Sequence, residues 1–433
     1  MRFNPKYLSL LLFTSSVLYA NEVGVDGQVR LRFDTFDNMN EKYYGTNPKL
    51  GEAQDSYLMS RIQVGLFYRF NEEWDARISM QDARVFGWGF DNADWYNSEF
   101  NQVHSTQTDY FELYETYLRY SSNGFTVTAG RQKLPYGDMR VFGPGEWKNS
   151  GKWIWDAVKT SYKNGKNFLD FFYGAMMLHD PDEFSLNDRH GYYGAGMYGH
   201  YVYKEKAAIE PILAYKLNDE INAIYRKLES YYAGVRVYDK DFHGFFYDAT
   251  YVKSFGDYTQ LDAQTVDIDG VGYHADAGYH FKPIQTKLRV GYTYATGDNP
   301  NTKENENFDT VFGLSDKYYG RLNLFQWTNI KDSEINVIVD PYENTRIKLE
   351  YHTFYADEPS NKWLSYTIPS IQNDHYGDEV DLFGTYAYSK DFNILLGVGY
   401  FIAGEYVAEA ATKNQYITDD NAFGFVAQFT YNF

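Results

Sequence analysis

The feature that most constrains this chain is its last stretch, residues 423–433. Phe423, Phe425, Ala427, Phe429, Tyr431 and Phe433 alternate there with Gly424, Val426, Gln428, Thr430 and Asn432. Strict alternation predicts a half-buried strand with one large aromatic face and one small polar face. A terminal strand leaves a bare edge, and closure into a barrel removes that edge. Lipid outside and water inside explain the two faces, whereas the alternative is an edge strand of a soluble sandwich.

Composition favours the membrane barrel. Aromatic residues make up 19% of the 433 residues, with 44 Tyr and 32 Phe, and rings of this kind collect at membrane–water interfaces. The mean hydropathy of −0.56 argues against a membrane protein built from helices, and no apolar run after the N-terminal segment is long enough to span as a helix. The absence of cysteine removes disulfides and is compatible with export.

Residues 1–20 are predicted to be a signal peptide. Arg2 and Lys6 form its positive part, residues 8–18 its apolar core, and cleavage is expected after Ala20. This segment carries two positive and no negative charges, so its removal changes the formal net charge from −19 to −21. The mature chain, residues 21–433, is expected to be one acidic barrel domain, because no proline-rich linker or helical periodicity divides it.

Short and long connections alternate along the mature chain. Tight turns are predicted at 70–74, 120–125, 162–168, 203–207, 238–242, 281–286, 340–345 and 388–392. Longer acidic or glycine-rich loops are predicted at 37–54, 87–108, 133–153, 179–191, 217–230, 256–264, 297–330, 356–378 and 404–421. Seventeen connections between neighbouring antiparallel strands predict 18 strands, with both ends of the chain on the short-turn side. The predicted fold is an all-β, up-and-down transmembrane barrel with short periplasmic turns and long extracellular loops.

Charged residues oppose apolar ones along several of these segments. Leu58, Ile62, Val64 and Leu66 alternate with Arg61, Gln63 and Gly65, and 74–81, 287–294 and 346–352 repeat the pattern. A basic residue on the lipid face costs roughly 2–4 kcal/mol at mid-bilayer, so the charged faces are predicted to line a water-filled lumen.

The predicted inward residues form a mixed wall with a modest basic excess. The basic ones are Arg30, Arg32, Arg61, Arg77, Arg119, Arg236, Lys287, Arg289, Arg346 and Lys348, and the acidic ones are Asp26, Asp34, Asp75, Glu115, Glu350, Glu379 and Asp381. Arginine pairs bidentately with carboxylates, so a ladder of arginines predicts a path for an anionic saccharide. The alternative is that these charges pair with one another and brace the wall. Further acid is expected in the loops, for example at Asp180, Asp182, Glu183 and Asp188.

Five blocks resemble the alginate-export family of outer-membrane barrels. They are GRQKLPYGD (130–138), NSGKWIWDAVK (149–159), GYTYATGD (291–298), FDTVFGLSDKYYG (308–320) and GDEVDLFGTYAYSKDFNILLGVGYFIAGE (377–405). The resemblance implies an 18-stranded channel that passes an anionic polysaccharide through an arginine-bearing constriction. It gives Arg131, which lies in the first block, a wall or constriction role, and extends that role to Glu115 and Arg119 on the preceding strand. It also implies that Phe433 belongs to the signal read by the barrel assembly machinery.

Enzymatic and metal sites find little support in the sequence. His104, His179, His190 and His200 are the residue types that a barrel hydrolase would need, but no Gly-x-Ser-x-Gly or His-Glu-x-x-His string accompanies them. The acids of 267–270 and 419–421 lack the spacing of a calcium loop, so they are interpreted as solvated or as weak divalent contacts with lipopolysaccharide. We expect no catalytic activity, cofactor or bound metal.

The sequence leaves two functions from different classes open. The first is a passive channel for anionic saccharides, with a general or cation-preferring porin as its variant. The second is a plugged barrel whose extracellular loops bind ligands or surfaces, since loop 297–330 could fold inward. Expected partners are outer-membrane lipid and lipopolysaccharide, the assembly machinery, the saccharide and periplasmic export proteins, but no nucleic acid. Arg119 and Arg289 are the first pair whose neutralisation should alter ion selectivity.

Overall fold

The computed structural model describes residues 22–97, 102–103, 107–179, 181, 184, 188–218, 225–260 and 262–433. The predicted signal peptide, His104 and the loop acids Asp180, Asp182 and Glu183 lie outside these residues.

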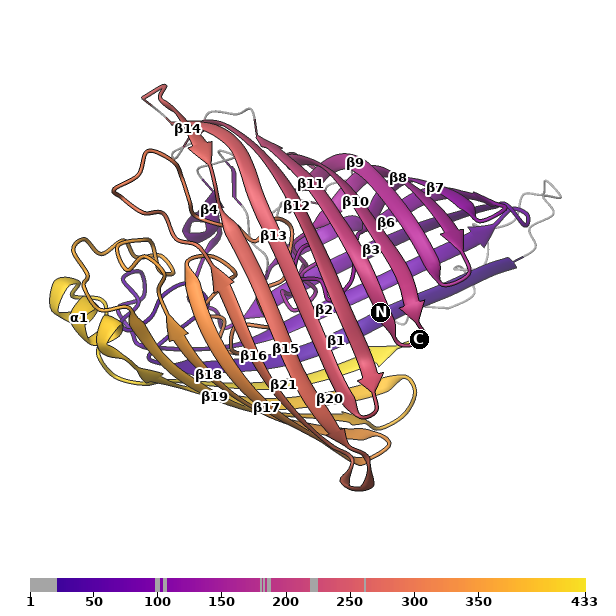
Figure 1. Cartoon of the computed structure of the whole chain (residues 1–433). Helices are drawn as coiled ribbons and strands as arrows, with labels where there is room; N and C mark the ends of the chain where they lie inside the picture. Colours follow the sequence, from indigo (N-terminus) through magenta and orange to yellow (C-terminus); the bar gives the residue numbers. More distant parts are fainter. Residues whose placement is uncertain are drawn as a thin grey trace, which may run out of the picture.

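Long antiparallel strands form almost the whole structure (Figure 1). The barrel strands are β1 (Glu22–Asp37), β2 (Gln54–Arg69), β3 (Trp74–Phe86), β6 (Asp109–Ser122), β7 (Phe125–Lys133), β8 (Ile154–Asn164), β9 (Asn167–Met177), β10 (His190–Lys204), β11 (Ala207–Asn218), β12 (Tyr225–Phe242), β13 (Phe245–Gln260), β14 (Thr265–Ile268), β15 (Val271–Phe281), β16 (Thr286–Ala295), β17 (Ile330–Tyr342), β18 (Thr345–Tyr355), β19 (His375–Ala387), β20 (Phe392–Ala403) and β21 (Ala422–Asn432). A separate small ribbon pairs β4 (Tyr96–Asn97) with β5 (Gln102–Val103).

The sheet closes on itself because β1 pairs with β21, from Gln28 opposite Asn432 to Asp37 opposite Phe423. Phe433 adds a further rung, since its N–H and C=O both bond to Gly27 at 3.0 Å. Of the 19 strands in the described sheet, β14 and β15 follow one another along β13 and make one interrupted barrel strand. The barrel therefore has the 18 strands that the sequence predicts.

The turns confirm the predicted alternation with one correction. Seven short connections fall where they were predicted, but the turn between β12 and β13 lies at 243–244 rather than 238–242. The strands continue past the expected turn because Asp239 still pairs with Tyr247 and, after an irregularity, Phe242 pairs with Phe245. The connections predicted at 217–230 and 256–264 are also shorter than expected, because the strands extend into them. β12 begins at Tyr225 and β13 runs to Gln260.

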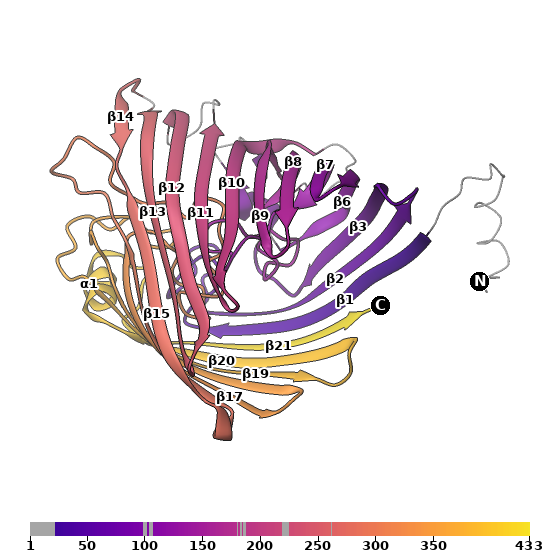
Figure 2. The same cartoon turned by 45° about the vertical axis from the view of Figure 1, so that its right-hand side comes forward.

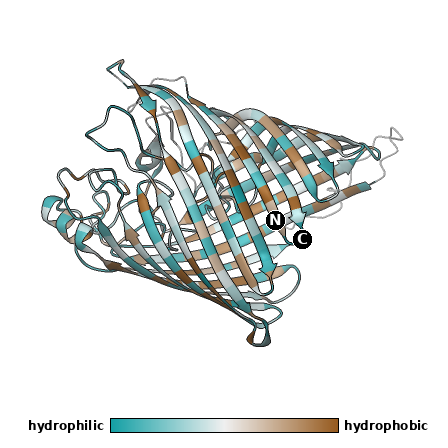
Figure 3. Ribbon diagram, in the orientation of Figure 1, coloured by the Kyte–Doolittle hydropathy of each residue, from teal (hydrophilic) through white to brown (hydrophobic). Residues whose placement is uncertain are grey.

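The two faces of the strands differ as predicted. On β2, Leu58, Ile62, Val64 and Leu66 are 42–48% exposed, whereas Arg61 between them is 4% exposed. Figure 3 shows the same alternation of hydrophobic and hydrophilic residues along the tilted strands. Lipid therefore contacts the apolar face and the charged face lines the interior.

The long loops lie at the end of the barrel away from the short turns. There α1 (Glu405–Lys413) buries Tyr406, Val407 and Ala410 against the strand ends of β19 and β20. Within the described residues, no helix is long and apolar enough to cross a membrane. Two of the long loops, 134–153 between β7 and β8 and 296–329 between β16 and β17, contact the inner faces of the strands, and Figure 2 shows chain crossing the interior.

Candidate functional site

Three arginines of β1 and β2 hold loop 134–153 inside the barrel. Arg30 and Arg61 donate to the carbonyl of Glu146 at 2.8 and 3.2 Å, and Arg32 donates to the carbonyl of Trp147 at 3.0 Å. The Arg32 guanidinium also lies 3.7 Å from the centre of the Trp147 ring. Each arginine is at most 4% exposed, so the loop covers all three.

Loop 296–329 is fixed to the wall across the interior. Arg321 Nε lies 2.7 Å from Glu350 of β18, and the N–H of Leu322 donates to Glu379 of β19 at 3.0 Å. Gly320 makes this approach possible, because its φ is +75° and a Cβ there would lie 2.4 Å from the Glu379 carboxylate. Glycine at this position therefore allows the loop to lie directly on the acidic wall.

The two loops also bind each other. Gly143 donates to the carbonyl of Phe312 at 3.0 Å, and the N–H of Phe312 donates to Val141 at 3.1 Å. Arg140 donates to Tyr319 and contacts His274 of β15 at 3.1 Å, with its guanidinium 3.8 Å from the centre of the Tyr318 ring. Buried aromatic side chains fill the space between the loops and the wall, among them Phe142, Trp155, Phe172, Phe308, Phe312 and Trp327. The interior is thus narrowed by a packed layer.

A cavity of about 310 Å³ lies between loops 38–53, 134–153, 296–329 and 356–374. Its charged lining consists of Lys42, Lys148, Lys152, Glu41 and Asp316. Lys148 forms a buried ion pair with Glu41, which leaves two lysines and one carboxylate. Burial lowers the pKa of Lys152 to about 8, and burial raises the pKa of Asp316. At neutral pH the cavity therefore carries a net positive charge.

A second, smaller cavity of about 20 Å³ lies next to it, and both are lined by Asn323. Arg32, Arg321 and Asp34 are its charged residues, and Trp147 and Phe383 form part of its wall. Arg32 pairs with Asp34 at 2.6 Å and Arg321 pairs with Glu350, so both arginines beside this cavity are neutralised locally. The cavity itself has room for about one water molecule.

Lys317 is an exposed cation of loop 296–329, as is Lys303, and it has no carboxylate within 4 Å in the described part of the chain. The pKa of Lys317 is lowered, chiefly by partial burial of its ammonium group. The nearby Asp138 raises this pKa, whereas Arg321 and Arg140 lower it further. Its ammonium group is therefore available to a passing anion in a neighbourhood that already holds two arginines.

Comparison with known proteins assigns this barrel to a family. A family model described as alginate export matches residues 23–418. The chain belongs to the alginate-export family. No curated protein sequence matches it.

Solved structures show the fold of this alginate-export family member. Crystal structures of OccAB2 and OccAB1 from Acinetobacter baumannii match with TM-scores of 0.64 and 0.60, at 11% and 12% identity. The alignments cover 96% and 97% of this chain and 99% and 100% of those chains. OpdQ from Pseudomonas aeruginosa gives a TM-score of 0.61 at 9% identity over 96% of this chain and 99% of that one. Family and fold together identify an outer-membrane β-barrel channel.

Most of the predicted inward cations pair with carboxylates of the wall. The pairs are Arg32 with Asp34, Arg77 with Asp26, Arg119 with Asp75, Arg131 with Asp156 and with the loop residue Asp188, Arg236 with Glu210 and Asp248, Arg289 with Asp276 and Glu334, Arg346 with Asp340, and Lys348 with Glu350. Lys287 has no such ion pair within the described residues. These contacts are the ones expected if the charges brace the wall. Most arginines of the predicted ladder therefore bind a neighbouring carboxylate.

The predicted acidic residues differ in surroundings. Glu115 lies 3.4 Å from the ammonium group of Lys133 and 3.9 Å from Arg77. Glu379 accepts a hydrogen bond from the backbone of loop 296–329, as described above. Asp381 is fully buried beside Glu379. Glu379 and Asp381 are therefore covered by the loop and do not face open water.

The histidines are also paired with acids. His179, His190 and His200 lie 2.7–2.8 Å from Asp109, Asp156 and Glu210 respectively. Three groups could each offer three ligand atoms within 4.8 Å of one another: Asp109, Glu112 and His179; His274, Asp276 and Glu334; and Glu334, Glu350 and His352. Several of these residues already form ion pairs across neighbouring strands, and the expected absence of a metal remains a prediction.

The sequence analysis missed the loop cations Arg140, Lys148, Lys152, Lys317 and Arg321. They were counted within long extracellular loops because the period-two pattern stops there. A usable signal was present, since Arg140 precedes Val141-Phe142 and Arg321 follows Tyr318-Tyr319-Gly320. Aromatic and apolar residues beside a cation in a long loop indicate a loop that is buried and therefore folds inward.

Proposed function

We propose that this channel passes anionic saccharides, such as an alginate-like polyuronate, along the cationic faces of its two inward loops. The observation that carries the proposal is that the cavity of about 310 Å³ keeps two lysines against one carboxylate after the Lys148–Glu41 pair is set aside. The family supports the same substrate class, because its description is alginate export. Lys317 adds an exposed ammonium group on the same loop as Arg321.

The arrangement suits a chain of carboxylates better than a single tight site. Each uronate carboxylate is attracted by Lys152 or Lys42 in the larger cavity and by Lys317 on loop 296–329. Several moderate sites in series allow a polymer to enter without being trapped, as conduction requires. The paired charges of the wall contribute little net field, so the loop cations set the preference.

This role requires neither catalysis nor a cofactor from the chain. We assign two roles to the predicted inward residues, from Arg30 to Asp381. They position the loops, and they line the water-filled part of the lumen. We also propose that Phe433 contributes to recognition by the assembly machinery, and that lipopolysaccharide and periplasmic export proteins are partners.

Block of the ionic current tests this function. The purified protein in a planar bilayer should conduct, and a hexauronate should reduce its current more than an uncharged hexasaccharide of equal length. Lys317→Gln should weaken the block, whereas Lys166→Gln, on the exposed turn between β8 and β9, should leave it unchanged.

Two results would contradict the proposal. A conducting pore that ignores the hexauronate would support a general or cation-preferring porin. Absence of conductance would support the plugged barrel with binding loops, for which the packed layer between the loops is the favourable observation.

A further inference from the structure

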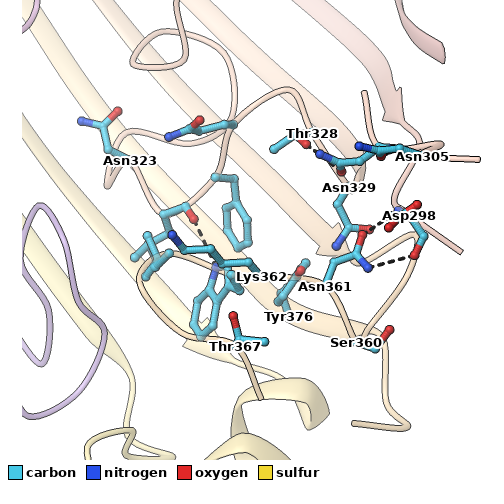
Figure 4. A pocket seen from close by; sticks show the side chains of 16 residues that line it. Asp298, Asn305, Asn323, Thr328, Asn329, Ser360, Asn361, Lys362, Thr367 and Tyr376 are labelled. Carbon is cyan, nitrogen blue, oxygen red and sulfur yellow. Dashed lines mark hydrogen bonds between the residues drawn. The ribbon is translucent and has the colours of Figure 1, made fainter. Parts of the chain in front are cut away.

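A third cavity opens on the long-loop side, between loops 296–329 and 356–374 (Figure 4). Its volume is about 600 Å³, within the roughly 300–1,000 Å³ typical of small-molecule sites. Asn323, Gln326 and Leu364 line both this cavity and the cationic one of 310 Å³, so the two adjoin.

Its lining is rich in uncharged polar groups. Amides and hydroxyls are contributed by Asn305, Asn307, Asn323, Gln326, Thr328, Asn329, Ser360, Asn361 and Thr367. Asp298 and Lys362 are its charged lining residues, and their formal charges cancel. No arginine lines it, in contrast to the cavity of about 20 Å³.

Two of the amides make the cavity rigid. Asn329 donates to the carbonyl of Glu358 at 3.0 Å and accepts from the N–H of the same residue at 2.7 Å. Asn361 forms the equivalent pair with the backbone of Asp298, at 3.0 and 2.6 Å. Figure 4 shows the Asn361 pair. Reciprocal bonds of this kind fix one loop to the other, so the cavity is formed before a ligand arrives.

Other amides remain available. Neither the Asn323 nor the Gln326 side chain hydrogen-bonds within the described part of the protein, and the Asn323 amide oxygen is buried without a donor. The side-chain NH₂ groups of Asn305 and Asn307 also have no acceptor among the described residues. A buried polar atom of this kind calls for a partner. Amides offer both donors and acceptors without charge, which matches the hydroxyl groups of a sugar.

Packed aromatic rings form one wall of the cavity. The rings of Phe325, Trp363 and Tyr376 lie 5.2–6.3 Å apart, and the Trp363 indole N–H donates to the Leu324 carbonyl at 3.2 Å. These side chains are at most 5% exposed. They keep the cavity's shape and give it a tryptophan next to the ligand space.

From these contacts we propose that this outer cavity binds an uncharged, hydroxyl-rich saccharide unit. Its zero net charge distinguishes it from the cationic path, so its ligand is selected by hydroxyl geometry and not by a carboxylate. The inference does not depend on the proposed conduction of anions, because binding here is measured without current. A saccharide in this cavity would stand against Asn323 and Gln326, beside the cationic cavity.

The test is equilibrium binding by the full-length purified protein. The probes are uncharged hexasaccharides of gluco-, manno- and galacto-configuration and a hexauronate, each followed by calorimetry and by Trp fluorescence. At least one uncharged probe should bind and perturb the fluorescence, and it should bind at least as tightly as the hexauronate at this cavity.

Two variants locate the binding. Asn323→Gly removes the amide while keeping a backbone that suits its φ of +60°, and Thr367→Val removes an exposed hydroxyl that lines this cavity but neither the cavity of about 310 Å³ nor that of about 20 Å³. Each should weaken binding about five- to tenfold. Ser370→Gly is the matched control, because Ser370 has a φ of +62° on the adjoining loop and does not line the cavity.

The proposal is overturned if no uncharged probe binds, or if both variants bind like the unaltered protein. It is also overturned if the hexauronate binds more tightly than every uncharged probe and Thr367→Val abolishes that binding. Conductance of the same preparations is a separate measurement. A conducting protein without saccharide binding would reject this cavity and leave the proposed channel standing.

Discussion

Lys317 tests how far an exposed loop cation outside the cationic cavity contributes to the proposed selectivity. An anion about 8 Å from one positive charge in water gains about 0.5 kcal/mol, and a cation loses as much. Lys317→Gln should therefore lower the anion-to-cation permeability ratio about two- to fivefold in bilayer reversal-potential measurements. Stability should change by less than about 0.5 kcal/mol, because the side chain is exposed and has no ion pair in the described chain. An equal effect of Lys166→Gln on the permeability ratio would show that the location of Lys317 on the inward loop is not what sets the selectivity.

Arg119 and Arg289 allow a test of the paired wall. Arg119 is held by Asp75, and Arg289 lies 2.9 Å from Glu334 and 3.4 Å from Asp276. Replacing both arginines with Gln releases these carboxylates, so ion selectivity should shift toward cations. Adding Asp75→Asn should restore part of the original preference. Unchanged selectivity in the double variant would count against both residues as parts of the lumen.

The Lys152 side chain predicts a pH dependence. Its pKa of about 8 lies below the ordinary value of 10.5 because burial disfavours the ammonium form. Lys152 therefore loses its charge as pH rises through about 8, and anion preference should decline between about pH 7 and 9. The folded state binds fewer protons than the unfolded state between about pH 8 and 10.5, so this group adds stability as pH rises there. Lys152→Gln should remove the selectivity step, and a step that persists would assign it to another group.

At the scale of elements, two inward loops narrow the interior of the barrel. Loop 134–153 depends on the arginines of β1 and β2, whose hydrogen bonds reach its backbone carbonyls. Backbone acceptors do not vary with the side chains of the loop, so the barrel wall specifies where the loop lies. In the proposed channel, the wall arginines affect the solute through the position of this loop.

Releasing that loop should widen the path. In Arg30→Gln with Arg61→Gln, each lost hydrogen bond from a charged donor costs about 1.5–3 kcal/mol, and the loop should leave the wall. Single-channel conductance should rise and become noisier, while circular dichroism keeps its β signature. Arg69→Gln is the control, because the Arg69–Glu22 pair is about half exposed and such pairs contribute about 0–1 kcal/mol. A conductance equal to that of the unaltered protein would show that loop 134–153 does not limit the current.

Sequence periodicity could predict the elements but not their inward contacts. Alternation along β2 and β21 gave the lipid face, and seven of the eight turns were placed correctly because short turns follow local rules. The contact of Arg30 with Glu146 joins residues 116 positions apart, and no local pattern reports it. The β12–β13 turn was misplaced because Tyr238 and Phe242 resemble the flanking rings of the other turns, yet the strand continues through them.

At the scale of the molecule, the ends of the chain close the barrel. Phe433 pairs through its backbone with Gly27, and a Cβ at Gly27 would lie 2.3 Å from the Phe433 ring. The glycine thus leaves space for the terminal ring on the outer surface of the seam. The predicted role of Phe433 in assembly and its role in closure fall on the same residue.

Phe433→Ala should separate these two roles. The backbone pairs remain, so the thermal transition of barrels that do assemble should change little, while the assembled fraction in outer membranes should fall severalfold. Heat-modifiable migration in gels measures that fraction. Tyr388→Ala is the control, because Tyr388 is an exposed aromatic residue on another short turn. Equal assembly of both variants would argue against a terminal signal.

The measurement that tests the central claim most directly is the reversal potential of the purified protein in a planar bilayer under a salt gradient. The cation-rich loop cavity of about 310 Å³ predicts an anion-selective pore although the whole chain carries a formal net charge of −19. A reversal potential of the sign expected for anions supports the loop-lined path. The opposite sign would mean that the acidic parts of the chain govern entry, and it would contradict the proposed passage of anionic saccharides.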